Sequence, residues 1–83
     1  LASPDDTLCA TAERTVLAEL EAGCTAPVAS TATIDGGRIT LRGGVFALDG
    51  SAQLIEEATG ADPVELGREV AKALFSGGAA RFL

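Results

Sequence analysis

The chain has 83 residues, enough for one ordinary hydrophobic core and too few for two. Hydrophobic residues make up 47% of it, and with three Phe and no Trp or Tyr the core must consist of Leu, Val, Ile and Ala. The net charge of −6 disfavours binding to a nucleic-acid backbone. Because His is absent and there are two Cys, histidine-based catalysis and a zinc site within this chain are excluded. We expect residues 1–83 to form a single domain.

The cysteine content and the short apolar runs also indicate in which cellular compartment the protein is found. Two cysteines are too few for the disulfide framework of a small secreted protein, and no basic segment followed by an apolar run marks a signal peptide. The apolar runs are far shorter than the roughly 20 residues that cross a bilayer. We therefore expect a soluble protein of a reducing compartment, the cytoplasm, without membrane contact. The chain begins at Leu1 rather than Met, as in a processed product or a piece of a longer protein.

A first helix is predicted from Pro4 to Ala22. Ser3 can cap it, and Pro4 suits its first position. Gly23 is expected to end the helix in the left-handed conformation, and Pro27 prevents its continuation. Apolar residues at helical spacing predict one buried stripe, formed by Leu8, Ala12, Val16, Leu17, Leu20 and Cys24.

Three β-rich runs follow, joined by two turns that contain glycine. Gly43 and Gly44 interrupt the second run, which indicates a bulge or a close approach of the backbone to another element. The third run alternates poorly because Leu54 and Ile55 are adjacent. The expected elements are a strand over residues 28–34, a turn at 35–37, a strand over 38–48, a turn at 49–50 and a strand over 51–58.

The last element begins with the clearest boundary in the chain. Asp62 can cap a helix, Pro63 suits its first position, and Glu65 completes a possible capping box. Gly67 costs about 1 kcal/mol against Ala inside a helix, so we expect it to permit close packing of this helix on the sheet. Gly77 and Gly78 end the helix. The expected buried stripe is Val64, Gly67, Val70, Ala71 and Leu74.

The resulting order, α-β-β-β-α, predicts an α+β fold with two layers. We expect a three-stranded antiparallel sheet with two helices packed on one face. The same order is found in double-stranded-RNA-binding domains, which use basic residues near the start of the last helix. Here Arg68 and Lys72 are the cations of that helix, and its first turn is acidic, so RNA binding is disfavoured. An interaction module without a cofactor is a further alternative.

Cys24 is the most informative position because it directly follows Gly23 and precedes Pro27 by three residues. In such a turn, the rigid backbone conformation would fix the position of the thiol. The helix C-terminus and the nearby Glu19 and Glu21 carry negative charge, so nothing stabilises a thiolate and a catalytic nucleophile is disfavoured. A covalent attachment point needs to react once and fits better. The other interpretation is a buried small apolar side chain, because free cysteine is among the most buried residue types.

Several segments in register resemble the C-terminal domain of the porphobilinogen deaminase (hydroxymethylbilane synthase) family. The chain has Ala22 where the family usually has Gly, and Ala26 where it has a β-branched residue, but it keeps the Gly-Cys turn and the proline. The matching segments are Glu13-Arg14, Leu20 to Cys24, Pro27 to Ala29, Leu41 to Gly43, Asp49 to Ser51, Leu66 to Ala71 and Gly78-Ala79.

The resemblance implies that Sγ of Cys24 forms a thioether to dipyrromethane, a permanent primer of two linked pyrroles. The family's enzyme adds four porphobilinogen units to this primer, releases ammonia each time, and hydrolyses off linear hydroxymethylbilane for tetrapyrrole (haem) biosynthesis. Its catalytic aspartate and its carboxylate-binding arginines lie mainly in two preceding domains. We therefore expect those domains and the pyrrole chain as partners, with no catalytic residue and no metal site in this chain. Alone, it should be inactive and lack the cofactor.

Three other residues have competing interpretations. Cys9 lies near the apolar stripe, where packing is the expected role, and a rise of 1.5 Å per residue puts it about 20 Å from Cys24, too far for a disulfide. Glu13 and Arg14 belong either to a solvated helix face or to a surface that meets the two other domains.

Overall fold

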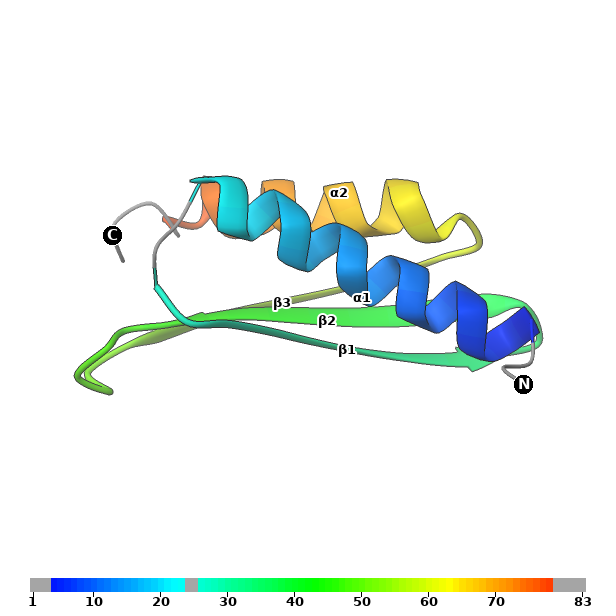
Figure 1. Ribbon diagram of the computed structural model, residues 1–83, viewed down its shortest axis with the longest axis horizontal. Helices are drawn as coiled ribbons and strands as arrows, with labels where there is room; N and C mark the ends of the chain where they lie inside the picture. Colours follow the sequence, from blue (N-terminus) through cyan, green and yellow to red (C-terminus); the bar gives the residue numbers. More distant parts are fainter. Residues whose placement is uncertain (1–3, 24–25, 79–83) are drawn as a thin grey trace.

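The computed structural model describes residues 4–23 and 26–78. Two helices lie over one face of a three-stranded antiparallel sheet with strand order β1-β2-β3 (Figure 1). The predicted α+β fold and its element order are confirmed. The elements are α1 (Pro4–Gly23), β1 (Val28–Asp35), β2 (Arg38–Phe46), β3 (Gln53–Gly60) and α2 (Pro63–Ser76).

The central strand β2 is the floor of the core. Ile39, Leu41 and Val45 are fully buried, and their alternation along β2 directs them toward the two helices. They pack with residues from both helices, which are Ala12, Val16, Leu20, Leu66, Val70, Ala71 and Leu74.

At Gly43, side chains of both helices come close to the backbone of the sheet. A Cβ added there would be 3.0 Å from Cγ1 of Val70 on α2 and 3.3 Å from Cγ2 of Val16 on α1. The ladders on both sides are continuous, with Gly43 opposite Ser30 of β1 and Glu56 of β3. The predicted close approach is therefore confirmed, and the alternative of a bulge is wrong.

The third strand alternates more regularly than its composition indicated. Leu54 packs against the core, whereas Ile55 lies on the opposite face of the sheet and is 36% exposed. The two adjacent apolar residues therefore serve different faces. The observed strand, Gln53–Gly60, is displaced by two residues from the predicted 51–58, because Ser51 belongs to the turn: its N–H donates to Oδ1 of Asp49 at 2.9 Å.

The predicted cap of α2 is present. Oδ1 of Asp62 accepts the backbone N–H groups of Val64 and Glu65, each at 3.0 Å. The side chain of Glu65 makes no return hydrogen bond within the described residues, so the structure has one half of the expected capping box. The C-cap is Gly77, and Gly78 follows with a φ of 110°, as expected for a glycine stop.

The buried stripe of α2 differs from the prediction at its first member. Val64 is 37% exposed, and Leu66, two residues later, is 2% exposed. The reason is that Val64 belongs to the first turn, near the groove between the two helices, whereas Leu66 points to the sheet side, where it lies 3.6 Å from the position of a Cβ on Gly60. The other four predicted members are buried.

Gly67 permits close packing, but against α1 rather than against the sheet as predicted. A Cβ at Gly67 would be 2.5 Å from Cβ of Thr15 and 3.1 Å from the carbonyl oxygen of Ala12. Sequence periodicity cannot tell a helix–helix contact from a helix–sheet contact when both lie on the buried side. The two helices therefore cross at a point where α2 has no side chain.

We expect Gly67→Ala to destabilise the chain by about 1–2 kcal/mol. Overpacking costs about 1–3 kcal/mol, and the 2.5 Å approach to Cβ of Thr15 places this site in the upper part of that range. The better helix propensity of Ala returns up to about 1 kcal/mol. Urea unfolding followed by circular dichroism measures the difference. Lys72→Ala, at an exposed position of the same helix, is the matched control and should change the free energy of unfolding by less than about 0.5 kcal/mol. A Gly67→Ala variant as stable as this control would contradict the close contact.

Candidate functional site

The connection between α1 and β1 carries Cys24, the predicted attachment residue. Cys24 and Thr25 lie outside the described residues, and the predicted cap Ser3 does as well. The structure therefore gives the geometry of the two flanks of this connection, Gly23 on one side and Ala26 with Pro27 on the other.

The first flank is held by a contact between the two helices. Gly23 is the last residue of α1 and has no positive φ, so the predicted left-handed cap is wrong. Glycine is needed at position 23 for packing and not for a left-handed backbone conformation. A Cβ at Gly23 would be 2.9 Å from Cζ of Phe75 near the end of α2, so glycine makes room for the aromatic ring.

The second flank is held by the core and by the sheet. Ala26 is 6% exposed and belongs to the core. The carbonyl oxygen of Pro27 accepts the backbone N–H of Phe46 at 3.0 Å, which extends the β1–β2 pairing by one hydrogen bond. Two residues, Cys24 and Thr25, thus separate two positions that are fixed by packing.

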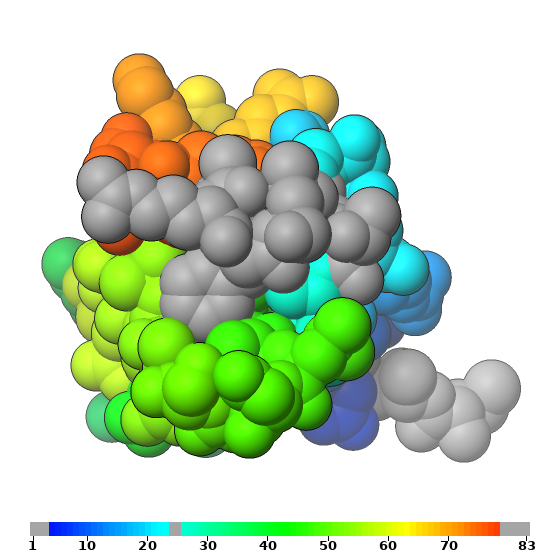
Figure 2. All heavy atoms as spheres, turned by 90° about the vertical axis from the view of Figure 1, so that its left-hand side faces the viewer, coloured from blue at the N-terminus to red at the C-terminus, as the bar shows by residue number. Residues whose placement is uncertain are grey.

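Both helices end at the same end of the molecule, which Figure 2 views directly. The C-terminal parts of α1 and α2 form the upper part of this view, and the connection between β2 and β3 projects below them. Gly50, with a φ of 75°, turns this connection, and hydrogen bonds from Ser51 lower the pKa of the Asp49 carboxyl. This end of the fold therefore carries the last turn of α1, the start of β1 and the β2–β3 turn (Figure 1).

The charges near the end of α1 are negative. Glu19 and Glu21 are exposed, and the last turn of α1 contains no basic residue. Arg68 of α2 lies 3.8 Å from Glu19, measured from Nε to Oε1, and both side chains are largely exposed, so this ion pair contributes little. The described residues around this end therefore offer nothing that would favour a thiolate over a thiol.

Glu13 does not lie on a solvated helix face. Its Oε2 accepts the backbone N–H of Ala32 at 2.8 Å, and its backbone carbonyl accepts Oγ–H of Ser30 at 3.1 Å. Because β1 is an edge strand, this carboxylate occupies an N–H group that would otherwise be open to pairing with another chain. Arg14 is exposed and has no ion pair among the described residues, so its contact with other domains stays a prediction.

We expect Glu13→Ala to cost about 1 kcal/mol in the free energy of unfolding, because it removes the acceptor of a half-buried N–H group. Glu13→Gln keeps an acceptor oxygen and should lose less than half of that amount. Chemical unfolding of both variants measures the difference, and Glu69→Ala, on the exposed side of α2, controls for loss of a surface carboxylate. Equal stability of the Ala and Gln variants would contradict a role for the hydrogen bond to Ala32.

Cys9 is a half-buried free thiol on α1, and its predicted packing role stays a prediction, because it is not among the side chains that pack against the core. Partial burial and the carboxylates of Glu13, Asp5 and Asp6 raise the pKa of this thiol above its usual 9.0. A raised pKa leaves the sulfur protonated at neutral pH and thus unreactive. Cys9 is therefore poorly suited to act as a nucleophile.

Cys9 should react slowly with iodoacetamide. In a Cys24→Ser variant, in which Cys9 is the remaining thiol, we expect the rate at pH 7.5 to lie below that of the same variant unfolded in urea. The rate should rise with pH and reach half of its maximum above pH 9.0, since the folded pKa is raised above that value. Mass spectrometry of quenched samples gives the rates. A half-maximum below pH 9 would show that the surrounding carboxylates do not act on this sulfur.

Comparison with known proteins shows the family to which this chain belongs. Residues 7–76 match the family model described as porphobilinogen deaminase, C-terminal domain. The chain belongs to the porphobilinogen deaminase family. The matched region contains all three strands, α2 and most of α1, together with the connection between α1 and β1. The predicted family is confirmed.

Curated relatives named porphobilinogen deaminase come from several bacteria. The protein of Corynebacterium aurimucosum is 58% identical and that of Corynebacterium glutamicum 56% identical, over 100% and 95% of this chain. The protein of Staphylococcus carnosus is 47% identical over 86% of the chain. The chain spans 29%, 28% and 23% of the lengths of these relatives. The chain therefore matches part of each of these relatives, and the family model that it matches describes the C-terminal domain.

The described helices carry no sign of a membrane span, since none is both long and apolar enough to cross a bilayer.

Sequence reasoning located the α1–β1 connection through its Gly-Cys pair. It missed the hydrogen bond from Ala32 to Glu13, which joins residues 19 positions apart. It also missed the contact of Gly23 with Phe75, because no local pattern links the ends of two helices.

Proposed function

We propose that this chain is the cofactor-carrying domain of a porphobilinogen deaminase, with dipyrromethane joined to Sγ of Cys24 through a thioether. The observation that supports it most is the fixing of both flanks of the α1–β1 connection in a chain of this family. Gly23 packs against Phe75 and Ala26 is buried in the core. A cofactor attached to the connection between these two fixed residues would stay within a small volume while the product grows.

The residues present fit an attachment role and little more. A thiol is the chemical group that a thioether requires, and Cys24 has this group two residues before a buried alanine. The pyrrole carboxylates of the cofactor need cations, but this chain has six Lys and Arg against twelve Asp and Glu. When bound, the dipyrromethane would supply the pyrrole carbon to which substrate units are added. The cations must come from elsewhere in the enzyme.

This distribution of charge supports a division of labour in a transferase of tetrapyrrole biosynthesis. The other two domains would bind porphobilinogen and the growing chain, and would hold the catalytic groups for four condensations, release of ammonia and final hydrolysis. The present domain, proposed to comprise residues 1–83, would anchor the primer. We therefore propose that it is inactive alone, that its partners are these two domains, and that it acts in the cytoplasm.

RNA binding, the alternative based on element order, is not supported by the described surface. The first turn of α2, where such domains contact phosphates, carries Glu65 after the capping Asp62. Arg68 is the first cation of this helix, and it faces Glu19. A duplex RNA would meet an acidic helix N-terminus here.

Intact mass tests the attachment site in a full-length enzyme that contains this chain. We expect a mass increment of two pyrrole units in the wild type and in Cys9→Ser. In Cys24→Ser the increment should be absent and hydroxymethylbilane formation should fall to background. The 83-residue chain produced alone should carry no increment, because the primer would be assembled in a site made with the other domains.

Cys9→Ser is the matched control, since it removes the other thiol of the chain. Peptide mapping of the wild type should place the increment on the tryptic peptide with Cys24. An increment that persists in Cys24→Ser, or that maps to Cys9, would refute the proposed attachment.

A further inference from the structure

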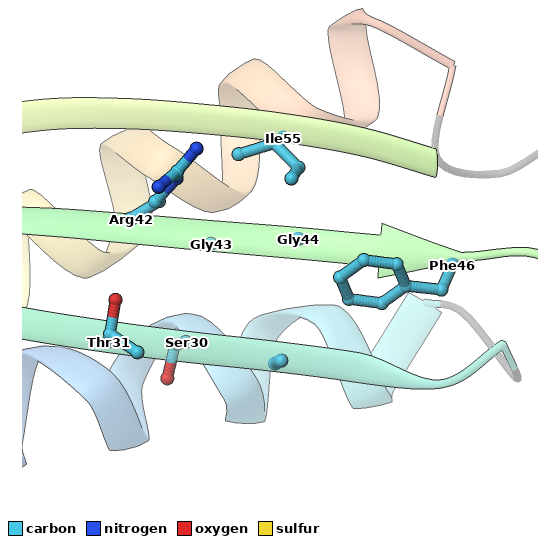
Figure 3. Close-up of a pocket in the computed structure, with 8 residues that line it drawn as sticks. Ser30, Thr31, Arg42, Gly43, Gly44, Phe46 and Ile55 are labelled. Atoms are coloured by element: carbon cyan, nitrogen blue, oxygen red, sulfur yellow. The ribbon is translucent and has the colours of Figure 1, made fainter. Parts of the chain in front are cut away.

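A hollow lies on the face of the sheet opposite to the two helices (Figure 3). It measures about 310 Å³ and lies over Gly44 of β2, which is opposite Ala29 of β1 and Ile55 of β3. Because Ala29 has a small side chain and Gly44 has none, the sheet carries little side-chain volume at these two positions, next to the larger Ile55. The hollow is thus a consequence of sequence rather than a gap between poorly packed elements.

The walls of this hollow are apolar. The ring of Phe46 extends along the sheet over Gly44, where a Cβ would be 2.9 Å from Cζ of the ring (Figure 3). Ile55 forms the wall on the β3 side, with Cγ1 3.6 Å from the same position. The aromatic ring of Phe46 therefore covers the backbone at Gly44, and together with Ile55 it gives the hollow an apolar lining.

One cation lies beside the apolar part. Arg42 lines the hollow, and its guanidinium has no ion pair and no hydrogen bond within the described residues. Thr31 of β1 and Glu57 of β3 are its partners in register. Glu57 is the carboxylate of the neighbouring strand on this face, and it is not within ion-pair distance of Arg42. Such a guanidinium is free to bind a carboxylate with two parallel hydrogen bonds.

We propose that this hollow binds a small planar molecule that carries a carboxylate group. Its single ring or its two fused rings would lie against Phe46 and Ile55, and its carboxylate would bind Arg42. The size supports this class, because about 310 Å³ is at the lower limit of small-molecule pockets, which begin at roughly 300 Å³. The ring of Phe46 supports a ligand with an aromatic ring, because two aromatic rings can stack in an offset arrangement. This site does not depend on the proposed role of Cys24.

The probe is 2-naphthoate, titrated into the ¹⁵N-labelled chain at constant ionic strength. We expect saturable shifts of the backbone amide signals of Thr31, Gly43, Gly44 and Ile55, with the neutral 2-naphthamide binding about fivefold or more weakly, since it lacks the charge. Arg42→Gln should weaken 2-naphthoate binding about fivefold and leave binding of the amide unchanged. Glu57→Gln should strengthen binding of the carboxylate, because it removes the competing charge.

Arg38→Gln is the matched control, because Arg38 lies on the same face of β2 but outside the hollow. It should leave binding unchanged. Gly44→Val should abolish binding, because the new side chain would displace the ring of Phe46, and the dispersion of the amide signals reports whether each variant is folded. Shifts that do not saturate, that spread over the helices, or that are equally affected by Arg38→Gln and Arg42→Gln would overturn the proposal.

Discussion

The missing side chain of Gly43 is the feature on which the rest of the fold depends. At this position the central strand lets Val16 of α1 and Val70 of α2 approach the backbone of the sheet. The two helices can then lie low on β2 and also contact each other, where Gly67 leaves room for Thr15. A larger residue at Gly43 would lift both helices and loosen the core below them.

This packing reaches the α1–β1 connection through the ends of the helices. Because α2 lies beside α1, Phe75 meets Gly23 at the end of α1. Because α1 lies over β1, Glu13 can bind the free edge of that strand, and Ala26 is drawn into the core. The positions of Gly23 and Ala26 are therefore linked to the same helix–sheet contact that stabilises the domain. The proposed attachment at Cys24 would use this rigidity in place of charged groups.

Local signals in the sequence predicted the elements well. Asp62 and Pro63 fix the start of α2 because the cap uses residues that are adjacent in the chain, and the two hairpin turns contain glycines with positive φ. Contacts between elements were harder to predict. The partner of Gly67 was assigned to the sheet, and Gly23 was given a conformation it does not adopt, because a glycine can serve a turn or a close contact. The hollow over Gly44 depends on strand register, which composition does not reveal.

The electron density of a full-length enzyme that contains this chain would test the central claim most directly. The account predicts continuous density from Sγ of Cys24 to a pyrrole ring, with Gly23 against Phe75 and Ala26 within the core. A Cys24 sulfur enclosed by aliphatic side chains, with no density beyond it and no path to the other domains, would contradict it.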